Sequence, residues 1–220
     1  MVEAIHPRIV ILLGRSGAGK GTQAKLLQEK YGLTYMGSGD LLRERATHDD
    51  FSGKKIHTVL ASGGFSPTIF IAKLWMDKFE EFKQLENFKG VLFDGSPRKL
   101  LEAQLIDQAI AWYEWEGDQR VFLLDIPRDV AYQRLIDRRI CKACSFVTSI
   151  HETPDTSCPT CHNSLDIRFD DKPDLINSRL DLFESEVEPV VEYYEKNNRL
   201  TRINGVGEIS EIFESICKYL

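Results

Sequence analysis

The sequence predicts an α/β protein with a five-stranded parallel sheet and helices on both of its faces. Short apolar runs alternate with helical patterns along most of the chain, and the first run leads directly into a glycine-rich turn. Alternating strands and helices favour a parallel sheet, because each helix returns the chain to the same end of the sheet before the next strand. The strand-like runs are residues 9–13, 33–36, 91–93, 121–124 and 200–203.

Length and composition predict one domain, residues 1–220, that carries inserts. The 220 residues are 42% hydrophobic, which is enough for a single sizeable core. No apolar run approaches the roughly 18 residues of a membrane span, and residues 9–13 are too few for a secretion signal, so we expect a cytoplasmic protein. The net charge of −6, from 28 Lys and Arg against 34 Asp and Glu, argues against nucleic acid and membranes as partners.

The first strand-like run ends in the sequence GRSGAGKGT at residues 14–22. A strand, a glycine-rich turn and a helix that begins near Lys20 direct backbone N–H groups and the positive helix end at one point, where phosphates bind. Lys20 is then expected to reach the outer phosphates of a nucleoside triphosphate. Gly21 stands where the strict pattern has Ser or Thr, and Thr22 follows. A chance turn is the alternative, and similar loops occur in GTPases, motor ATPases and small-molecule kinases, so the pattern predicts a ligand and not a reaction.

Two apolar stripes at helical spacing follow in the last third of the chain. We expect both to be core, because apolar residues that repeat every three or four positions line one face of a helix. The stripes are Ile176, Leu180, Phe183, Val187, Val190 and Tyr194, and then Ile209, Ile212, Phe213, Ile216 and Leu220. Trp75, Trp112 and Trp115 lie in amphipathic stretches, and we expect them to pack as well.

Four cysteines form two Cys-x-x-Cys pairs within the long polar region 141–171. They are Cys141, Cys144, Cys158 and Cys161. Paired turns of this kind place four thiolates around one zinc ion, and a reducing cytoplasm disfavours disulfides, so we predict a closed structural zinc site; disulfides or an empty site are the alternatives. Because four cysteines fill such a site, His151 and His162 are expected to be solvated. Cys217 is expected to be a small buried residue of the last helix.

Polar motifs follow the second and third strand-like runs, where ligands bind in open parallel sheets. They read SGDLLR at residues 38–43 and DGSPR at residues 94–98. Asp94 ends an apolar strand and has the placement of a carboxylate that organises Mg²⁺ or its waters. A turn or helix-capping aspartate is the alternative.

Arginines flank the cysteine region on both sides. Arg134, Arg138 and Arg139 precede it, and Arg168 and Arg179 follow it. We expect the first three to lie on a helix, where Arg134 and Arg138 share one face at i, i+4 and a phosphate chain would relieve their mutual repulsion. Solvated surface charges are the alternative.

Taken in order, these motifs resemble those of the adenylate kinase family, in its long form with a zinc-stabilised lid. They are GKGTQ, SGDLLR, DG-x-PR, a helical Arg-x₃-Arg and a four-cysteine insert, and the resemblance runs from about residue 8 to the end. It implies a P-loop kinase fold with a helical insert at 37–66 that binds the nucleoside monophosphate and a zinc-binding lid at 137–171. It also implies a monomer that reversibly transfers the terminal phosphate of ATP to AMP with Mg²⁺, giving two ADP.

The resemblance further implies roles for individual residues. Those expected to bind ATP are Gly17, Ala18, Gly19, Lys20, Gly21, Thr22, Arg134, Arg138, Val147, Thr148 and Gly207. Those expected to bind AMP are Ser38, Arg43, Gly64, Phe65, Ser66, Gly95, Ser96, Pro97, Arg98, Glu102, Arg168 and Arg179. Those expected to act in catalysis are Lys20, Asp94, Arg98, Arg138, Arg168 and Arg179.

The chain departs from the family pattern mainly on the acceptor side. Ser96 replaces a phenylalanine, Glu102 replaces the glutamine that reads the acceptor adenine, and Ser66 replaces a valine, whereas Ser16 and Ser38 are mild changes. A kinase for GMP, CMP or UMP is therefore an alternative. Two further alternatives are a kinase for another small metabolite and a zinc-ribbon binding module with a regulatory ATP site. SGDLLR combined with a four-cysteine lid disfavours the former, and the acidic charge balance disfavours a nucleic-acid role for the latter.

Overall fold

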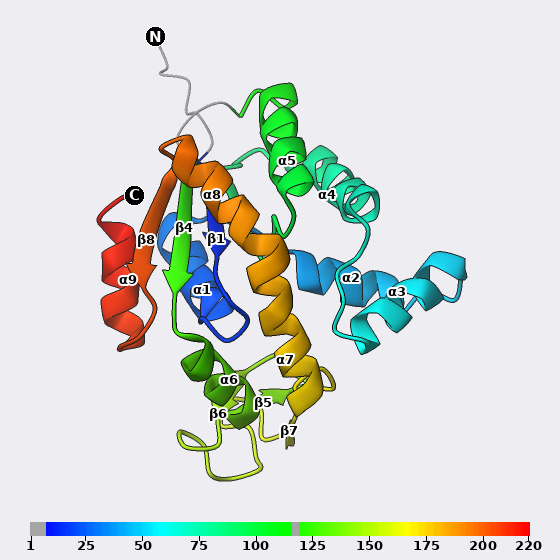
Figure 1. The fold of residues 1–220 in the computed structure, drawn as a ribbon, viewed down its shortest axis with the longest axis vertical. Coiled ribbons are helices and arrows are strands. Elements are labelled where there is room, and N and C mark those ends of the chain that lie inside the picture. Colours follow the sequence, from blue (N-terminus) through cyan, green and yellow to red (C-terminus); the bar gives the residue numbers. More distant parts are fainter. Residues whose placement is uncertain (1–7, 116–118) are drawn as a thin grey trace.

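A computed structural model describes residues 8–115 and 119–220, in which helices and strands alternate along most of the chain (Figure 1). The strands are β1 (Arg8–Leu13), β2 (Thr34–Gly37), β3 (Gly90–Asp94), β4 (Gln119–Asp125), β5 (Arg138–Cys141), β6 (Val147–Ser149), β7 (Leu165–Asp166) and β8 (Leu200–Asn204). The helices are α1 (Lys20–Tyr31), α2 (Ser38–Ala46), α3 (Phe51–Ala61), α4 (Thr68–Lys83), α5 (Leu100–Trp112), α6 (Arg128–Asp137), α7 (Pro173–Leu182), the π-helical turn η1 (Phe183–Val187), α8 (Glu188–Lys196) and α9 (Ile209–Cys217).

The main sheet has five parallel strands in the order β2-β3-β1-β4-β8, which confirms the predicted fold class. β1 lies at its centre, where Ile9 pairs with Val91 of β3 on one side and with Gln119 of β4 on the other. Each predicted run lies within one of these strands, apart from Leu33, which precedes β2 by one residue. Because the strands are parallel, their carboxyl ends meet at one edge of the sheet, and the glycine-rich loop leaves β1 at that edge.

Helices cover both faces of this sheet and form two hydrophobic cores. Along β1 the side chains alternate, so that Ile9 and Ile11 lie in the core with α4, α5 and α8. Val10 and Leu12 lie in the opposite core with α1, α6 and α9. All four side chains are fully buried. A strand that is buried on both faces reads as a continuous apolar run, which explains the sequence of β1.

The predicted core residues lie in these two cores, with two exceptions. Ile209, the first residue of α9, is 50% exposed, because Ile212 and Ile216 define the buried face of this short helix. Trp112 is 77% exposed at the end of α5, since it lies half a turn around the helix from the buried Ala103. The other two tryptophans are buried, as predicted.

The continuous helix formed by α7, η1 and α8 passes from one core to the other. Ile176 and Leu180 of α7 lie in the core with α1 and α6. Val187 of η1 and Val190 of α8 lie in the opposite core. The change of core coincides with the π-helical turn, a feature that occurs frequently at functional sites.

Two segments extend from the layered core near the carboxyl ends of the strands (Figure 1). α2 and α3 follow β2 on one side, and a three-stranded antiparallel sheet, in the order β6-β5-β7, follows α6. These elements lie within the expected inserts at 37–66 and 137–171, whose limits stay predictions. Among the described helices, none combines the length and the apolar character needed to span a membrane.

Candidate active site

The phosphate-binding loop links β1 to α1 and is fixed by close packing. Gly14 and Gly17 have φ values of 145° and 86°. A Cβ atom at Gly14 would lie 2.6 Å from the carbonyl oxygen of Leu124, and one at Gly17 would lie 2.8 Å from that of Ala131. Only glycine therefore lets the loop pack this closely against β4 and α6. α1 begins at Lys20, as predicted.

The ammonium group of Lys20 lies inside this loop. Its Nζ donates hydrogen bonds to the carbonyl oxygens of Gly14, at 2.7 Å, and Arg15, at 2.9 Å. Burial lowers the pKa of Lys20 to about 8, and the nearby carboxylate of Asp94 partly offsets this effect. An anionic ligand would favour the charged form, so the group is suited to contact a phosphate oxygen. The other loop and first-turn residues expected to bind ATP are Ala18, Gly19, Gly21 and Thr22.

Three cationic side chains from different elements line one cavity of about 40 Å³. They are Lys20 of α1, Arg98 of the loop after β3 and Arg179 of α7. Arg98 Nε donates to the carbonyl oxygen of Gly95 at 2.7 Å, and its guanidinium lies 4.8 Å from the centre of the Phe65 ring. Burial and the neighbouring Arg179 lower the pKa of Arg98. Like charges around a cavity repel one another unless an anion lies between them, so the cavity is suited to a phosphate group.

Two consecutive aspartates bind the arginines that flank the three-stranded sheet of β5, β6 and β7, called the small sheet below. Asp171 has a fully buried side chain and accepts two hydrogen bonds from Arg138, at 2.8 Å and 2.6 Å, and one from Arg179, at 3.0 Å. Arg179 also pairs with Asp170 at 3.3 Å, and Arg168 pairs with Asp170 at 3.7 Å. Burial and nearby arginines lower the pKa of Arg168 to about 10. Since a buried carboxylate requires such partners, Asp171 fixes the directions of two predicted site arginines.

Arg138 and Arg139 do not lie on a helix, contrary to the prediction. α6 ends at Asp137, and Arg138 is extended (φ −64°, ψ 137°) as the first residue of β5. The expected i, i+4 pairing of Arg134 with Arg138 is therefore wrong. The bidentate ion pair with Asp171 and the pairing of β5 with β6 take the place of another helical turn.

The remaining residues expected on the ATP side lie in two places. Arg134 of α6 donates to the carbonyl oxygen of Gly205 at 3.1 Å, which brings it to the loop that contains Gly207. Val147 is exposed on β6, whereas Thr148 is buried and hydrogen-bonds within the segment that carries the small sheet.

Buried hydroxyl groups lie on the expected acceptor side, between α2, α4 and the loop after β3. Ser38 and Ser96 hydrogen-bond to each other, and Trp75 Nε1 donates to Ser38 Oγ at 3.3 Å. Each of these three side chains is at most 2% exposed. Ser66 is buried too, and Arg43 makes an ion pair within α2 at 2.6 Å. The other residues expected here are Gly64, Phe65, Gly95 and Pro97, of which the last three line the cavity.

Asp94 lies at the end of β3, beside the first turn of α1. A Cβ atom at Gly21 would lie 3.5 Å from its Oδ2. The hydroxyl of Tyr35 lies 3.1 Å from Asp94 Oδ2 and 3.2 Å from Asp40 Oδ2. Burial and the charges of Asp94 and Asp40 raise the pKa of Tyr35, which keeps this hydroxyl protonated. Asp94 thus presents a carboxylate, the ligand type that Mg²⁺ prefers, next to the phosphate-binding loop.

Glu102 is the third residue of α5 and is only 3% exposed. Its Oε2 accepts a hydrogen bond from the backbone N–H of Arg98 at 2.6 Å. Burial raises the pKa of Glu102, and this hydrogen bond opposes the rise. Reaching back to an N–H that precedes the first helical turn is the behaviour of a capping glutamate. The side chain expected to read the acceptor base therefore also holds the backbone of Arg98.

The four cysteines of the paired motifs meet at one point on the small sheet. Their Sγ atoms all lie within 4.8 Å of one another, with 3.4 Å between Cys141 and Cys161 and 3.6 Å between Cys144 and Cys158. These separations exceed the roughly 2 Å of a disulfide and fit four thiolates about 2.3 Å from one zinc ion. Hydrogen bonds from the side chain and backbone of Asn163 lower the pKa of Cys161.

Three smaller predictions about this region have mixed outcomes. His151 and His162 are exposed, as expected of solvated loop residues. Cys217 is partly exposed on α9, so the prediction that it is buried is wrong. Among the described residues, the possible metal ligands that cluster here are the four cysteines of the paired motifs, without either histidine.

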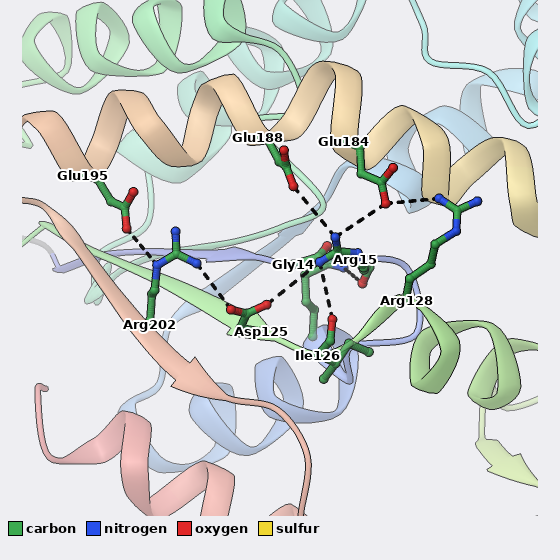
Figure 2. A network of polar contacts seen from close by, with 10 residues as sticks. Gly14, Arg15, Asp125, Ile126, Arg128, Glu184, Glu188, Glu195 and Arg202 are labelled. Carbon is green, nitrogen blue, oxygen red and sulfur yellow. Dashed lines mark hydrogen bonds and ion pairs between the residues drawn. The ribbon is translucent and has the colours of Figure 1, made fainter.

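Arg15, the second residue of the phosphate-binding loop, carries no prediction from the sequence. Its guanidinium lies between three carboxylates (Figure 2): Glu184 at 3.6 Å, Glu188 at 3.8 Å and Asp125 at 3.9 Å. It also lies 4.5 Å from the centre of the Phe183 ring. These contacts tie the loop to η1, α8 and the end of β4. The one sign of this role in the sequence is an arginine within a glycine-rich turn. Its partners lie far away in the sequence, and no local pattern indicates them.

Comparisons with known proteins agree with this geometry. A family model described as Adenylate kinase matches residues 12–199. A protein named Adenylate kinase from Thermodesulfovibrio yellowstonii is 36% identical over 214 residues, covering 96% of this chain and 98% of that protein. Proteins with the same name from Elusimicrobium minutum and Clostridium kluyveri are 34% identical over 216 residues and 32% identical over 208 residues. These matches cover 96% and 93% of this chain, and 98% and 94% of the relatives.

Proposed function

Because this chain belongs to the adenylate kinase family, and is thus a nucleoside monophosphate kinase, we propose that it reversibly transfers the terminal phosphate of ATP to AMP, forming two ADP. The observation that carries the proposal is the cavity at the carboxyl ends of the strands, where cations from three elements meet beside the phosphate-binding loop. A phosphoryl group in transfer spreads negative charge over its oxygens, and such a cluster stabilises that charge.

On the donor side, the loop at 14–22 binds the phosphates of ATP through its backbone N–H groups and Lys20. Arg134 lies beside the loop at 205–207, where the adenine ring is proposed to bind near Gly207. Val147 and Thr148 contact ATP from the small sheet when that segment closes. The other donor-side residue is Arg138, whose direction Asp171 sets.

On the acceptor side, AMP lies between the insert at 37–66 and the loop at 94–98. Arg98 and Arg179 bind its phosphate in the cavity, with Arg43 and Arg168 at the edges. Ser38, the backbone at 64–66 and Glu102 lie toward the base. The buried Glu102 carboxylate is the feature that supports a broader acceptor range, since guanine offers two adjacent donors to a carboxylate.

The chemistry requires alignment and charge stabilisation and no nucleophile from the protein. Lys20, whose ammonium is held at the loop by two carbonyl oxygens, stabilises the negative charge of the transferred group. Arg98 and Arg179, which line the same cavity as Lys20, neutralise the same group. Asp94 is the carboxylate that would hold Mg²⁺ or its waters, and the metal would supply positive charge that offsets the negative charge of the phosphate groups.

The cysteine segment supplies the lid over this site. Zinc would be held by Cys141, Cys144, Cys158 and Cys161, as a closed structural site with no open position for substrate. The lid spans 137–171 and excludes water when both nucleotides are bound, since water would otherwise accept the phosphate. We expect a monomer that works in the cytoplasm and binds no nucleic acid.

A coupled assay of ADP formation from Mg·ATP tests the proposal. The acceptors are AMP, GMP, CMP, UMP and water, and Lys20→Met is the inactive control. We expect AMP to give the highest kcat/KM, with water negligible. Negligible ADP from ATP and AMP, with rapid transfer to another monophosphate, would overturn AMP as the acceptor. No transfer to any monophosphate would overturn the kinase.

A further inference from the structure

The buried hydroxyl pair Ser38 and Ser96 has one hydrogen more than its described partners accept. Trp75 Nε1 can only donate, so Ser38 Oγ accepts from it. The two serines share one further hydrogen bond. Two hydroxyl groups carry two hydrogens, and one bond between them uses one hydrogen. The second hydrogen has no acceptor among the described residues. Both side chains are nevertheless buried, with exposures of 2% for Ser38 and 1% for Ser96.

The position of the cavity decides where this hydrogen points. Ser96 lines the cavity that also contains Lys20, Arg98 and Arg179, whereas Ser38 does not line it. Ser38 Oγ already accepts a hydrogen bond from Trp75, and its own hydroxyl hydrogen finds an acceptor if it is donated to Ser96 Oγ. The hydroxyl hydrogen of Ser96 then faces the cavity. A buried donor without an acceptor is costly, so a ligand atom in the cavity that accepts this hydrogen would gain from it.

The three cations define the chemistry of that ligand atom. A cavity lined by an ammonium and two guanidinium groups selects an anionic oxygen. We propose that Ser96 donates a hydrogen bond to a phosphate oxygen of the acceptor nucleotide, and that Trp75, through Ser38, is the positioning residue that keeps the hydrogen directed at it. This inference rests on the proposed function and names a contact for which the family pattern, with phenylalanine at this position, has no hydroxyl.

Calorimetric titration with AMP tests the contact without requiring turnover. Ser96→Ala should raise the Kd for AMP about tenfold, because it removes one hydrogen bond to a charged group. The same factor should hold for CMP and UMP, since the phosphate is common to them, and binding of adenosine should not change. The Kd for ATP, measured in the same way, should also be unchanged.

Trp75→Phe should raise the Kd for AMP two- to fivefold, because the hydroxyl of Ser96 is then free to turn toward Ser38. Trp115→Phe is the matched control: it removes an equally buried indole, 2% exposed, from the neighbouring aromatic cluster, and should leave AMP binding unchanged. Circular dichroism and Tm confirm that each variant is folded.

An unchanged Kd for AMP in folded Ser96→Ala would overturn the inference, as would a factor that depends on the base or an equal loss for adenosine. Equal effects of the two tryptophan variants would remove Trp75 from the relay. If the wild-type protein binds AMP but forms no ADP, the proposed reaction fails while the binding test of Ser96 still stands. If ADP forms normally and Ser96→Ala binds AMP like the wild type, the inference alone fails.

Discussion

The phosphate-binding loop rests on β1, whose residues 9–12 are fully buried, whereas the small sheet after α6 has almost no apolar core. In the small sheet the buried cluster consists of Cys141, Cys158 and Leu165, with Phe146 and Cys161 packed against them. Apolar burial thus shapes the first region, and four thiol groups shape the second.

This difference separates stability from activity in one region and couples them in the other. Burial of the central strand contributes on the order of 25 cal/mol for each Å² of apolar surface, so the sheet can hold Lys20 and Arg98 in an environment that disfavours their charge. The small sheet has no such reserve, and the binding energy of a metal would be its folding energy.

The largest effect is expected from Lys20→Met, which tests whether the loop separates activity from stability. It should lower kcat by a factor of about 100 or more, since the cation proposed to contact the transferred phosphate is lost. Tm should not fall, because the buried cation is destabilising in the free protein. The coupled assay and thermal unfolding measure both effects, with Lys25→Met on the exposed side of α1 as the control. More than half the wild-type rate, with normal circular dichroism, would remove Lys20 from the site.

A large loss of stability is expected from Cys158→Ser, which tests the opposite behaviour in the small sheet. Cys158 is fully buried, so the variant should lose the zinc and lower Tm by roughly 5 °C or more. Activity at 20 °C should fall about tenfold, since the lid then closes poorly. Elemental analysis of protein purified without chelator should find one zinc per chain in the wild type and in Cys217→Ser. A fully active, metal-free protein with four intact thiols would contradict the zinc lid.

An alkaline decline in rate is expected because the pKa of Lys20 is lowered to about 8. The ammonium form binds phosphate, so kcat/KM for ATP should fall about tenfold for each pH unit above 8. The stability of the fold should change in the opposite direction. Because the folded state favours the neutral amine, Lys20 destabilises the fold below pH 8, and this cost decreases as the pH rises from about 8 toward 10.5. Lys20→Arg, if active, should have a flat profile to pH 10. A wild-type profile that is flat to pH 10 would show that Lys20 is not the titrating group.

The smallest effect is expected from Glu102→Gln, because this residue caps α5 and is also proposed to lie toward the acceptor base. Glutamine can donate to adenine N1 and accept from the amino group, so KM for AMP should fall and any activity with GMP should decrease. Burial raises the pKa of Glu102, so the carboxylate costs stability at neutral pH and the cost disappears as the pH falls below its unfolded pKa. The variant should therefore have a slightly higher Tm at pH 7, with a smaller difference near pH 4.

Two outcomes would count against these expectations for Glu102. An unchanged ratio of kcat/KM for AMP and GMP would show that the side chain does not read the base. A lower Tm at pH 7 would show that its charged hydrogen bond to Arg98 outweighs the cost of burial.

Local patterns predicted most of the sheet, the start of α1 and the clustering of the four cysteines. Residues 9–13 form a strand and Lys20 begins α1, because apolar runs and glycine-rich turns act over a few residues. The four cysteines lie together, as their spacing in two Cys-x-x-Cys pairs predicted. In each case the sequence pattern and the element that it predicts lie within one short segment, or within two copies of the same short motif.

The errors and omissions concern contacts between distant residues. Arg138 leaves the helical pattern because its partner, Asp171, lies 33 residues later, and periodicity carries no information about that ion pair. The hydrogen bond from Arg15 to the carbonyl oxygen of Ile126 spans 111 residues. Trp112 is exposed because the buried face of α5 is set by the helices packed against it, which a single amphipathic window does not reveal.

The π-helical turn η1 constrains how the length of this chain can vary. Its wider turn accommodates the change of core between Leu180 and Val187, while Arg179, one turn earlier, lines the cavity. Deleting one residue here would leave an unbroken α-helix but rotate everything beyond it by about 100°, so either Val190 or Arg179 would face the wrong way. Natural insertions and deletions are therefore expected in the loops before α7 and after α8, and not within 183–187. One residue more or less there would break the link between Arg179 in the cavity and the packing of Val190 in the other core.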